Sequence, residues 1–197
     1  MSEQSQPSRT RDAEATKARL LRAATAEFAA HGIAGARVDR ISTAARANKA
    51  LIYAYFGNKD RLFDAVLDAH VARVLDEVPF TPEDLPGYAG HLFDFLLANP
   101  NQLRLAAWQR LERAGTGAGG DPAGMSDSMR RKIDAVAGEQ GARRLPADFA
   151  PADLVVFTLA LTCAWMPTSA MAPTLGDGDR IEGHRAAVVE AVRRLLR

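Results

Sequence analysis

The sequence lacks the features on which membrane and secreted proteins depend. Its longest apolar stretches are interrupted well before the roughly 20 residues that a membrane-spanning helix needs. A single cysteine, Cys163, excludes an internal disulfide framework and favours a reducing compartment. The opening residues, MSEQSQPSRTRD, carry charged side chains and no apolar core, unlike a secretory signal. These absences predict a cytoplasmic protein with no membrane helix.

Catalytic and metal-binding patterns are also missing. The four histidines and Cys163 fall on separate segments without metal-ligand spacing. Asp177, Asp179 and Glu182 are too few and too closely spaced for a calcium loop. The run GTGAGG at 115–120 has no strand before it and no phosphate-binding helix after it, which favours a mobile linker. We expect no metal, no cofactor and no enzymatic activity, with a helical enzyme as the distant alternative.

Charge is divided unevenly along the chain, although the net charge of its 197 residues is only +1. The residues up to Asp64 include eleven basic and seven acidic side chains, a local net charge of +4. The remainder carries fourteen basic and seventeen acidic side chains, a net charge of −3. A positive N-terminal lobe can approach phosphates while a slightly negative body stays away from them.

The spacing of apolar residues predicts an all-α protein. Apolar side chains recur at intervals of three and four, and no alternation of period two is long enough for a sheet. Thr16 is expected to cap the first helix, and Gly32 to end it in a left-handed conformation. Further helices are expected at 38–45, at 49–55, from a cap at Asn58 to Pro79, at 82–99, around 103–111, around 129–136, at 152–171, and from a capping box of Asp179 and Glu182 to Leu195.

The stretch from Arg37 to Phe56 carries the clearest functional pattern. Two short helices joined by a tight turn follow an amphipathic helix, which is typical of a helix-turn-helix that places its second helix in the major groove of DNA. The side chains expected to face inward are Val38, Ile41, Ala45 and Ile52. Those left on the outer face are Arg40, Lys49, Ala50, Tyr53 and Tyr55. Lysine ammoniums and tyrosine hydroxyls donate well to phosphates, although Tyr53 fits core packing equally well.

The segment from Thr16 to Val71 resembles the DNA-binding domain of TetR-type transcriptional regulators. The resemblance rests on LLRAATAEFAAHG, on Val38 and Ile41 followed by two alanines, on LIYAYF at 51–56, and on NKDRLF at 58–63. It implies that Lys49, Ala50 and Leu51 face bases, while Tyr53, Tyr55 and Lys59 hold phosphates. It also implies a phosphate contact from backbone N–H groups at the start of the helix that begins at Val38.

The chain departs from the family at several of these positions. Arg46 stands where family members usually have glycine, and a left-handed conformation there would cost an arginine about 1 kcal/mol. Either the turn differs, or Arg46 reaches the DNA backbone. Ala50 and Leu51 favour apolar contacts, such as thymine methyl groups, over hydrogen bonds to bases. Arg9 and Arg11 are expected in a disordered tail rather than in the minor groove.

The resemblance further implies three parts: a disordered arm at 1–12, a helix-turn-helix DNA-binding domain at 13–58, and a helical ligand-binding and dimerisation domain at 59–197. We expect a homodimeric repressor that binds palindromic operator DNA and is released by a small apolar or aromatic effector. The candidate ligand contacts are His70, Phe93, Phe95, Trp108, Leu111, Phe157 and Trp165. Each of them also fits a purely structural role in the core. The alternative is a helix-turn-helix regulator that senses no small molecule.

Overall fold

The computed structural model describes residues 6–113, 125–169 and 180–197. The described residues form helices and no strand, so the all-α prediction is confirmed. They divide into two compact units: residues up to His70 join those from Arg104 in the first, and Val71–Leu103 join those from Ala123 in the second. The predicted linker at 115–120 lies outside the described residues.

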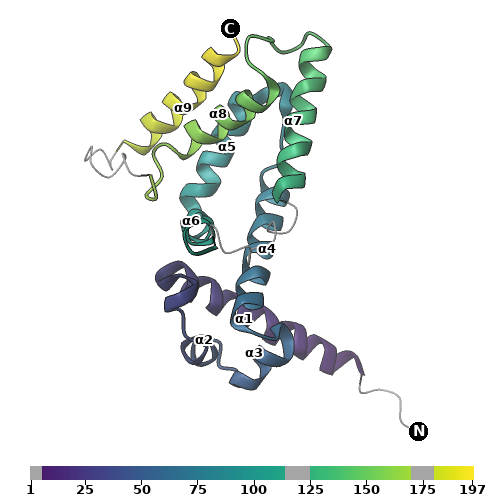
Figure 1. Ribbon diagram of the computed structural model, residues 1–197, viewed down its shortest axis with the longest axis vertical. Helices are drawn as coiled ribbons and strands as arrows, with labels where there is room; N and C mark the ends of the chain where they lie inside the picture. The colour runs from purple at the N-terminus through teal and green to yellow at the C-terminus, as the bar shows by residue number, and fades with distance from the viewer. Residues whose placement is uncertain (1–5, 114–124, 170–179) are drawn as a thin grey trace. The chain divides into compact units, whose positions relative to one another are not determined.

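The first unit contains the helix-turn-helix segment. It comprises α1 (Gln6–Gly35), α2 (Val38–Ala44), α3 (Lys49–Phe56), the first part of α4 (Lys59–Glu77) and most of α6 (Asn101–Arg113) (Figure 1). The second comprises the end of α4, a 3-10 turn η1 (Pro82–Asp84), α5 (Leu85–Ala98), α7 (Met125–Gly141), α8 (Pro151–Cys163) and α9 (Ile181–Leu195). Helices α4 and α6 contribute residues to both units. The division between the two compact units therefore does not coincide with the expected boundary between residues 58 and 59.

Apolar side chains from every helix of the first unit meet in one core. Phe28 of α1 and Phe63 of α4 are fully buried and pack edge to face, with ring centroids 5.1 Å apart. Ile41 and Ala45 from the α2 region and Ile52 from α3 join them, as their spacing predicts. Val38 is half-buried and packs against the same core. The two short helices are therefore held on α1 and α4 by their apolar faces.

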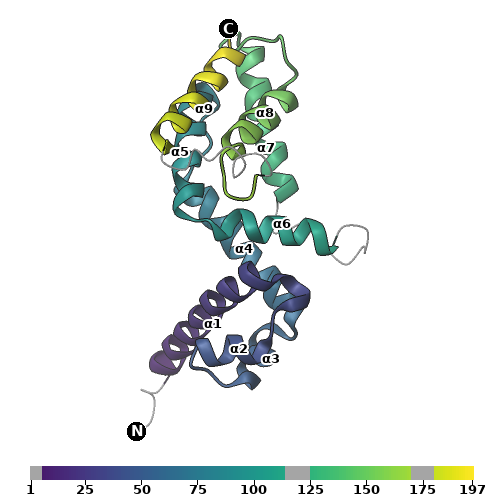
Figure 2. The ribbon, with the colours of Figure 1, turned by 90° about the vertical axis from the view of Figure 1, so that its left-hand side faces the viewer.

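The second unit is a layered helical bundle around α5. This helix packs against α8 and α9, and α7 packs against α8 (Figure 2). Its core includes the buried rings of Tyr88, Phe93 and Phe95. Burial, together with the nearby Cys163 thiol, raises the pKa of Tyr88 to about 12.

The ends of the first helix differ from expectation. Asn58 caps α4 as predicted, because its Oδ1 accepts a hydrogen bond of 2.8 Å from the N–H of Arg61. Thr16, in contrast, lies inside α1 and donates to the carbonyl of Asp12 at 2.8 Å, so the prediction that it caps the helix is wrong. Residues 6–12 of the expected arm are helical, since α1 begins at Gln6 with Pro7 in its first turn, where a missing N–H is tolerated. Residues 1–5 lie outside the described residues.

Three other helix boundaries are corrected. The helix expected at 152–171 ends at Cys163 and is followed by turns to Ser169. Residues 82–84 form a 3-10 turn, after which Asp84 caps α5 through a bond of 2.9 Å from the N–H of Gly87. The last helix begins at Ile181 after Arg180, which makes no side-chain capping bond; Asp179 of the expected capping box lies outside the described residues.

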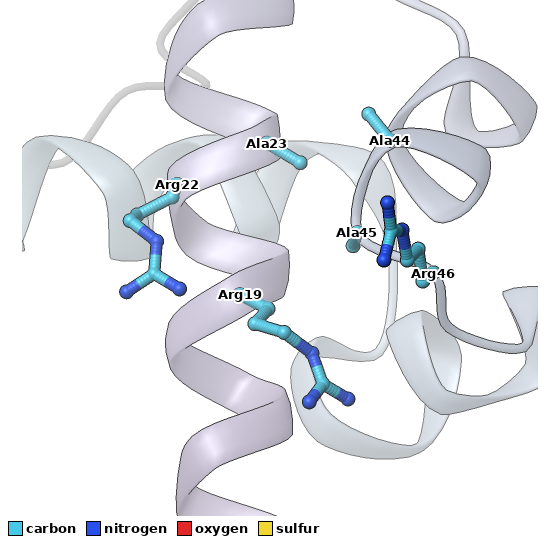
Figure 3. A pocket seen from close by; sticks show the side chains of 6 residues that line it. All are labelled: Arg19, Arg22, Ala23, Ala44, Ala45 and Arg46. Atoms are coloured by element: carbon cyan, nitrogen blue, oxygen red, sulfur yellow. The ribbon is translucent and has the colours of Figure 1, made fainter.

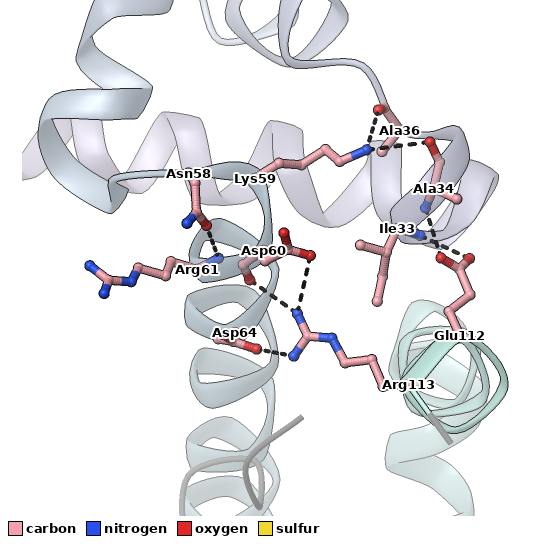
Figure 4. A network of polar contacts seen from close by, with 10 residues as sticks. All are labelled: Ile33, Ala34, Ala36, Asn58, Lys59, Asp60, Arg61, Asp64, Glu112 and Arg113. Atoms are coloured by element: carbon pink, nitrogen blue, oxygen red, sulfur yellow. Dashed lines mark hydrogen bonds and ion pairs between the residues drawn. The ribbon is translucent and has the colours of Figure 1, made fainter. Parts of the chain in front are cut away.

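Gly32 is the most constrained backbone position of α1. Its φ is positive, as expected, at 70°, but its ψ of −175° is extended rather than left-handed helical, and a second helical segment continues past this kink to Gly35. Past the kink, the N–H groups of Ile33 and Ala34 donate to the two carboxylate oxygens of Glu112 at 3.0 and 2.7 Å (Figure 4). A Cβ at Gly32 would lie 2.1 Å from Glu112 Oε1 and 3.0 Å from the Trp108 ring. Both φ and space therefore require glycine.

We predict that Gly32→Ala lowers the free energy of unfolding by about 2–4 kcal/mol, because it strains the backbone and displaces the Glu112 carboxylate from two N–H groups. Gly138→Ala in α7 is the matched control, since a Cβ there meets nothing within 4 Å. The control is expected to raise stability by about 0.5–1 kcal/mol. Urea unfolding of both variants checks this, and equal effects would contradict the role assigned to the Gly32 kink.

Candidate nucleic-acid interface

The second helix of the helix-turn-helix, α3, presents a well-defined outer face. Asn48 caps it, accepting a hydrogen bond of 2.8 Å from the N–H of Ala50 through its side-chain oxygen. Ile52 and Phe56 are buried beneath the helix, and Leu51 is half-buried against the same core. The buried residues are four positions apart, so the intervening ones face outward. The outer face of α3 is therefore free to contact a binding partner along the length of the helix.

Two tyrosines, Tyr53 and Tyr55, occupy the outer face of α3. Tyr53 is 47% exposed and Tyr55 is 36% exposed, which is unusual for side chains of this size. The Tyr55 ring packs edge to face on Phe56, with centroids 6.3 Å apart, so its base is supported. Of the two alternatives for Tyr53, the exposure favours a hydroxyl offered to a partner over one packed in the core.

Arg40, predicted to face DNA, is engaged within the protein. Its guanidinium pairs with Glu27 at 2.6 Å and donates to the carbonyl of Gly35 at 3.0 Å. Burial disfavours ionisation of Glu27, but hydrogen bonds from Arg40 and from the N–H of Arg37 outweigh it and lower the pKa of that carboxyl. Arg40 and Glu27 together hold the start of α2 against α1.

Lys49, at the start of α3, is paired with an acid at the start of α2. Its ammonium lies 2.7 Å from Asp39 Oδ1, and both side chains are exposed. The hydrogen bond with Asp39 and the charge of that carboxylate raise the pKa of Lys49, so the ammonium remains charged at neutral pH. The pair places a negative charge beside the cation that the resemblance assigns to DNA.

Lys59 is engaged by the end of α1 and the loop that follows it. Its ammonium donates to the carbonyls of Ala34 and Ala36, both at 3.3 Å (Figure 4). Three of the four cations expected at the DNA surface, Arg40, Lys49 and Lys59, therefore have acceptors within the first unit.

Arg46 differs from these three. Of the alternatives left open by the sequence, the turn keeps the left-handed conformation, because Arg46 has a φ of 50° just after the end of α2. Its N–H donates to the carbonyl of Thr43 at 3.1 Å, and that of Ala47 to Ser42 at 3.0 Å, which together form a Schellman motif. Its side chain is exposed and lines a pocket of 480 Å³ between α1 and the α2–α3 turn (Figure 3).

The residues expected to contact an effector belong to both compact units. His70, Trp108 and Leu111 belong to the first unit, and the other four to the second. His70 Nε2 lies 3.3 Å from the Thr25 hydroxyl, and the Trp108 indole donates to the Ala29 carbonyl at 3.3 Å. Leu111 is 74% exposed. The interior position expected of Leu111 is therefore wrong.

The four remaining candidates occupy three environments in the second unit. Phe93 and Phe95 are buried in its core. Trp165 is half-buried and stacks on His184, with ring centroids 3.7 Å apart. Phe157 is 39% exposed, so its expected interior position is also wrong. The apolar residues on most sides of α8 conceal which of its faces is outermost, and periodicity alone could not have chosen.

Sequence reasoning missed two acids and an arginine whose interactions hold the helices of the first unit together. Glu27 and Glu112 bind backbone N–H groups, and Arg113, with its side chain 8% exposed, pairs with Asp64 and lies 5.1 Å above the Phe63 ring. Each interaction joins residues distant in sequence, so no local pattern marks it.

No group of His, Cys, Asp or Glu side chains within the described residues could hold a metal ion. None of the helices found there is long and apolar enough to cross a membrane.

In this helix-turn-helix the second helix is capped and presents an exposed outer face. These features are typical of one class of protein, the DNA-binding regulators. Comparison with known proteins supports this class at both ends of the chain. Residues 20–66 match the family model described as bacterial regulatory proteins of the tetR family. Residues 84–194 match the model described as a tetracyclin repressor-like C-terminal domain.

Individual relatives agree with these matches. The chain is 41% identical over 189 residues to the HTH-type transcriptional repressor SCO4008 of Streptomyces coelicolor, spanning 94% of this chain and 97% of the relative. It also resembles the structure of the putative transcriptional regulator SCO4942 from Streptomyces coelicolor, with a TM-score of 0.80, 35% identity, and coverage of 91% of this chain and 97% of that one. AibR, solved with isovaleryl coenzyme A and operator DNA, shares the fold at a TM-score of 0.64, with 15% identity and coverage of 88% and 96%.

The chain therefore belongs to the tetR family of bacterial regulatory proteins. It is a DNA-binding transcriptional regulator and not an enzyme. The family resemblance inferred from the helix-turn-helix segment is confirmed.

Proposed function

We propose that this regulator is a homodimeric repressor whose α3 helices enter successive major grooves of a near-palindromic operator, and that a small apolar or aromatic effector releases it. The observation that carries the proposal is the outer face of α3, where exposed Tyr53 and Tyr55 stand on a helix fixed by its cap and core. The curated relative that spans nearly the whole chain is itself a repressor.

The proposed contacts follow the order of side chains along that face. Lys49, Ala50 and Leu51 meet base edges at the start of α3, while Tyr53 and Tyr55 donate to phosphates. The N-terminus of α2, beginning at Val38, supplies backbone N–H groups, and Arg40, Arg46 and Lys59 supply positive charge. Residues 13–58 act as the DNA-binding domain and 59–197 as the ligand-binding and dimerisation domain.

The Lys49–Asp39 pair makes the DNA contact testable by a gain of function. Binding requires the Lys49 ammonium to leave Asp39 and contact a base edge, and Asp39, whose side chain is 74% exposed, also repels the DNA backbone. Removing its charge therefore frees the cation and lowers the repulsion at once. Removing the Asp39 charge also removes a negative charge that stabilises the N-terminus of α2, so we expect a small loss of stability.

We predict that Asp39→Asn tightens binding to a duplex selected from a randomised library by the wild-type protein. Lys49→Ala is expected to weaken binding by about 1–3 kcal/mol for each protomer, because a contact to a base edge is lost. Asp134→Asn in α7, an exposed acid of the second unit, controls for net charge. Fluorescence anisotropy at graded salt measures all three, and unchanged binding by both α2–α3 variants would remove Lys49 from the contact set.

An exposed apolar face on α8 supports the dimer. Val156 is 51% exposed and Phe157 39% exposed, and Phe157 packs edge to face on the 37% exposed Phe149 at 5.6 Å. Ile181, at the start of α9, is 44% exposed. Two packed helices with outward apolar side chains can form a four-helix bundle with their symmetry mates. Such a dimer places two α3 helices on one operator.

We predict that Val156→Glu shifts the protein from dimer to monomer at micromolar concentration, because the interface would bury an unpaired charge. Its exposure within the protomer means that the protomer still folds. Leu111→Glu is the control, since Leu111 is an equally apolar and more exposed side chain in the other unit. Sedimentation velocity distinguishes the outcomes: a wild-type monomer, or a dimer that survives Val156→Glu, contradicts this interface.

The effector is proposed to enter the second unit because its interior is apolar and aromatic. Tyr88, Phe93 and Phe95 lie there, and the buried hydroxyls of Thr158 and Thr162 already donate to helix carbonyls at 2.7 and 2.8 Å. An apolar ligand therefore loses least by entering. AibR, which shares the fold, was solved with both a ligand and operator DNA.

We predict that at least one compound in a library of apolar and aromatic metabolites raises the melting temperature and also releases DNA. Saturation at about a hundred times Kd corresponds to about 2.7 kcal/mol of stabilisation. Differential scanning fluorimetry identifies binders, and anisotropy with the selected duplex tests release. If no compound stabilises the protein, or binders leave DNA affinity unchanged, the regulator that senses no small molecule is the better description.

A further inference from the structure

The pocket beside the α2–α3 turn is lined by three arginines. Arg19 and Arg22 come from α1, one turn apart, and Arg46 comes from the turn; small side chains, Ala23, Ala44 and Ala45, complete the lining. The three arginine side chains are exposed. In Figure 3, the Arg19 guanidinium extends from α1 toward the turn that carries Arg46, while Arg22 extends on the other side of the helix. The alanines leave space between the two facing cations.

These arginines are not neutralised by the part of the chain that the structure describes. Arg40, Lys49 and Arg113 in the same unit each pair with a carboxylate. No such ion pair is found there for Arg19, Arg22 or Arg46, and Arg19 donates only to the hydroxyl of Thr16, at 3.1 Å. Like charges that converge without a counter-charge repel each other, and an anion between them relieves that repulsion.

We propose that Arg19 and Arg46 clamp a backbone phosphate of the bound DNA, with Arg22 adding positive charge to the wall of the same pocket. Arg46 lies three residues before Lys49, so this phosphate would lie beside the stretch of backbone that the start of α3 approaches. The exposure of all three side chains suits a polyanion whose phosphates stay partly hydrated better than a small anion that must be enclosed. This inference rests on the proposed mode of DNA binding and extends it from α3 to α1.

The left-handed backbone of Arg46 is not itself the reason for this proposal. Arg143 has the same geometry after α7, with φ of 57°. Its N–H donates to Gln140 at 2.9 Å and that of Arg144 to Glu139 at 2.9 Å, the same Schellman pattern. What sets Arg46 apart is the convergence with Arg19 across a pocket. Arg143 therefore provides an unusually close control for substitution of Arg46.

The experiment compares Arg46→Gly, Arg143→Gly and Arg19→Ala for DNA binding at graded salt, with the selected duplex as probe. Both glycine variants relieve a left-handed backbone and are expected to raise the midpoint of urea unfolding. Only Arg46→Gly is expected to weaken DNA binding, reducing the salt slope by about 0.9 per protomer and about 1.8 per dimer. A variant that is more stable yet binds less tightly cannot be explained by misfolding. Arg19→Ala is expected to reduce the slope by the same amount.

The outcomes separate this inference from the function on which it rests. If wild-type protein selects no duplex, DNA binding through α3 fails first. If it does, and Arg46→Gly or Arg19→Ala keeps the wild-type slope, only the arginine clamp is overturned. Thermal stabilisation by inorganic phosphate at constant ionic strength provides the second arm. Stabilisation that both arginine variants abolish, with DNA binding unchanged, would identify a small-anion site and overturn the assignment to DNA.

Discussion

The carboxylate of Glu112 against the kinked backbone at Gly32 is the contact on which the first unit depends. Glycine leaves space where any Cβ would stand, and the carboxylate fills it while accepting from the N–H groups of Ile33 and Ala34. The next residue, Arg113, pairs with Asp64 of α4. Two consecutive side chains at the end of α6 therefore hold α1 and α4 together, and the last turns of α6 belong with the DNA-binding helices.

This frame explains why several cations near the proposed DNA surface are already engaged within the protein. Arg40 draws the start of α2 to Glu27, and Lys59 binds the carbonyls of Ala34 and Ala36. Both interactions fix the loop between α1 and α2 before DNA arrives. A surface fixed in advance loses less entropy on binding than one that must be ordered by its partner. In the proposed binding mode, these cations contribute to affinity through the geometry they impose, in addition to any charge they offer to phosphates.

The sequence-based predictions succeeded where the cause is local. Helical spacing, the Asn58 cap and the positive φ of Gly32 depend on neighbours in the chain. The predictions failed where an interaction joins residues distant in sequence, or where a helix is apolar on most of its sides. Nothing near Glu112 in sequence indicates that it binds the backbone of α1, and α8 is apolar on so many sides that Phe157 could not be assigned outward. The assignment of residues to DNA depended on family resemblance, since exposed lysines occur on any helix.

Arg46 and Arg143 together show how local strain and function can be separated. Each arginine stands at the position after a helix where glycine is the least strained residue, and each turn makes the same two hydrogen bonds. Strain of this kind is therefore tolerated at more than one turn of this chain, and it does not by itself mark a site. A site is indicated when the strained residue also contributes to a converging set of uncompensated charges. By that criterion the turn before α3, with Arg19 facing it from α1, extends the DNA-binding surface beyond the recognition helix.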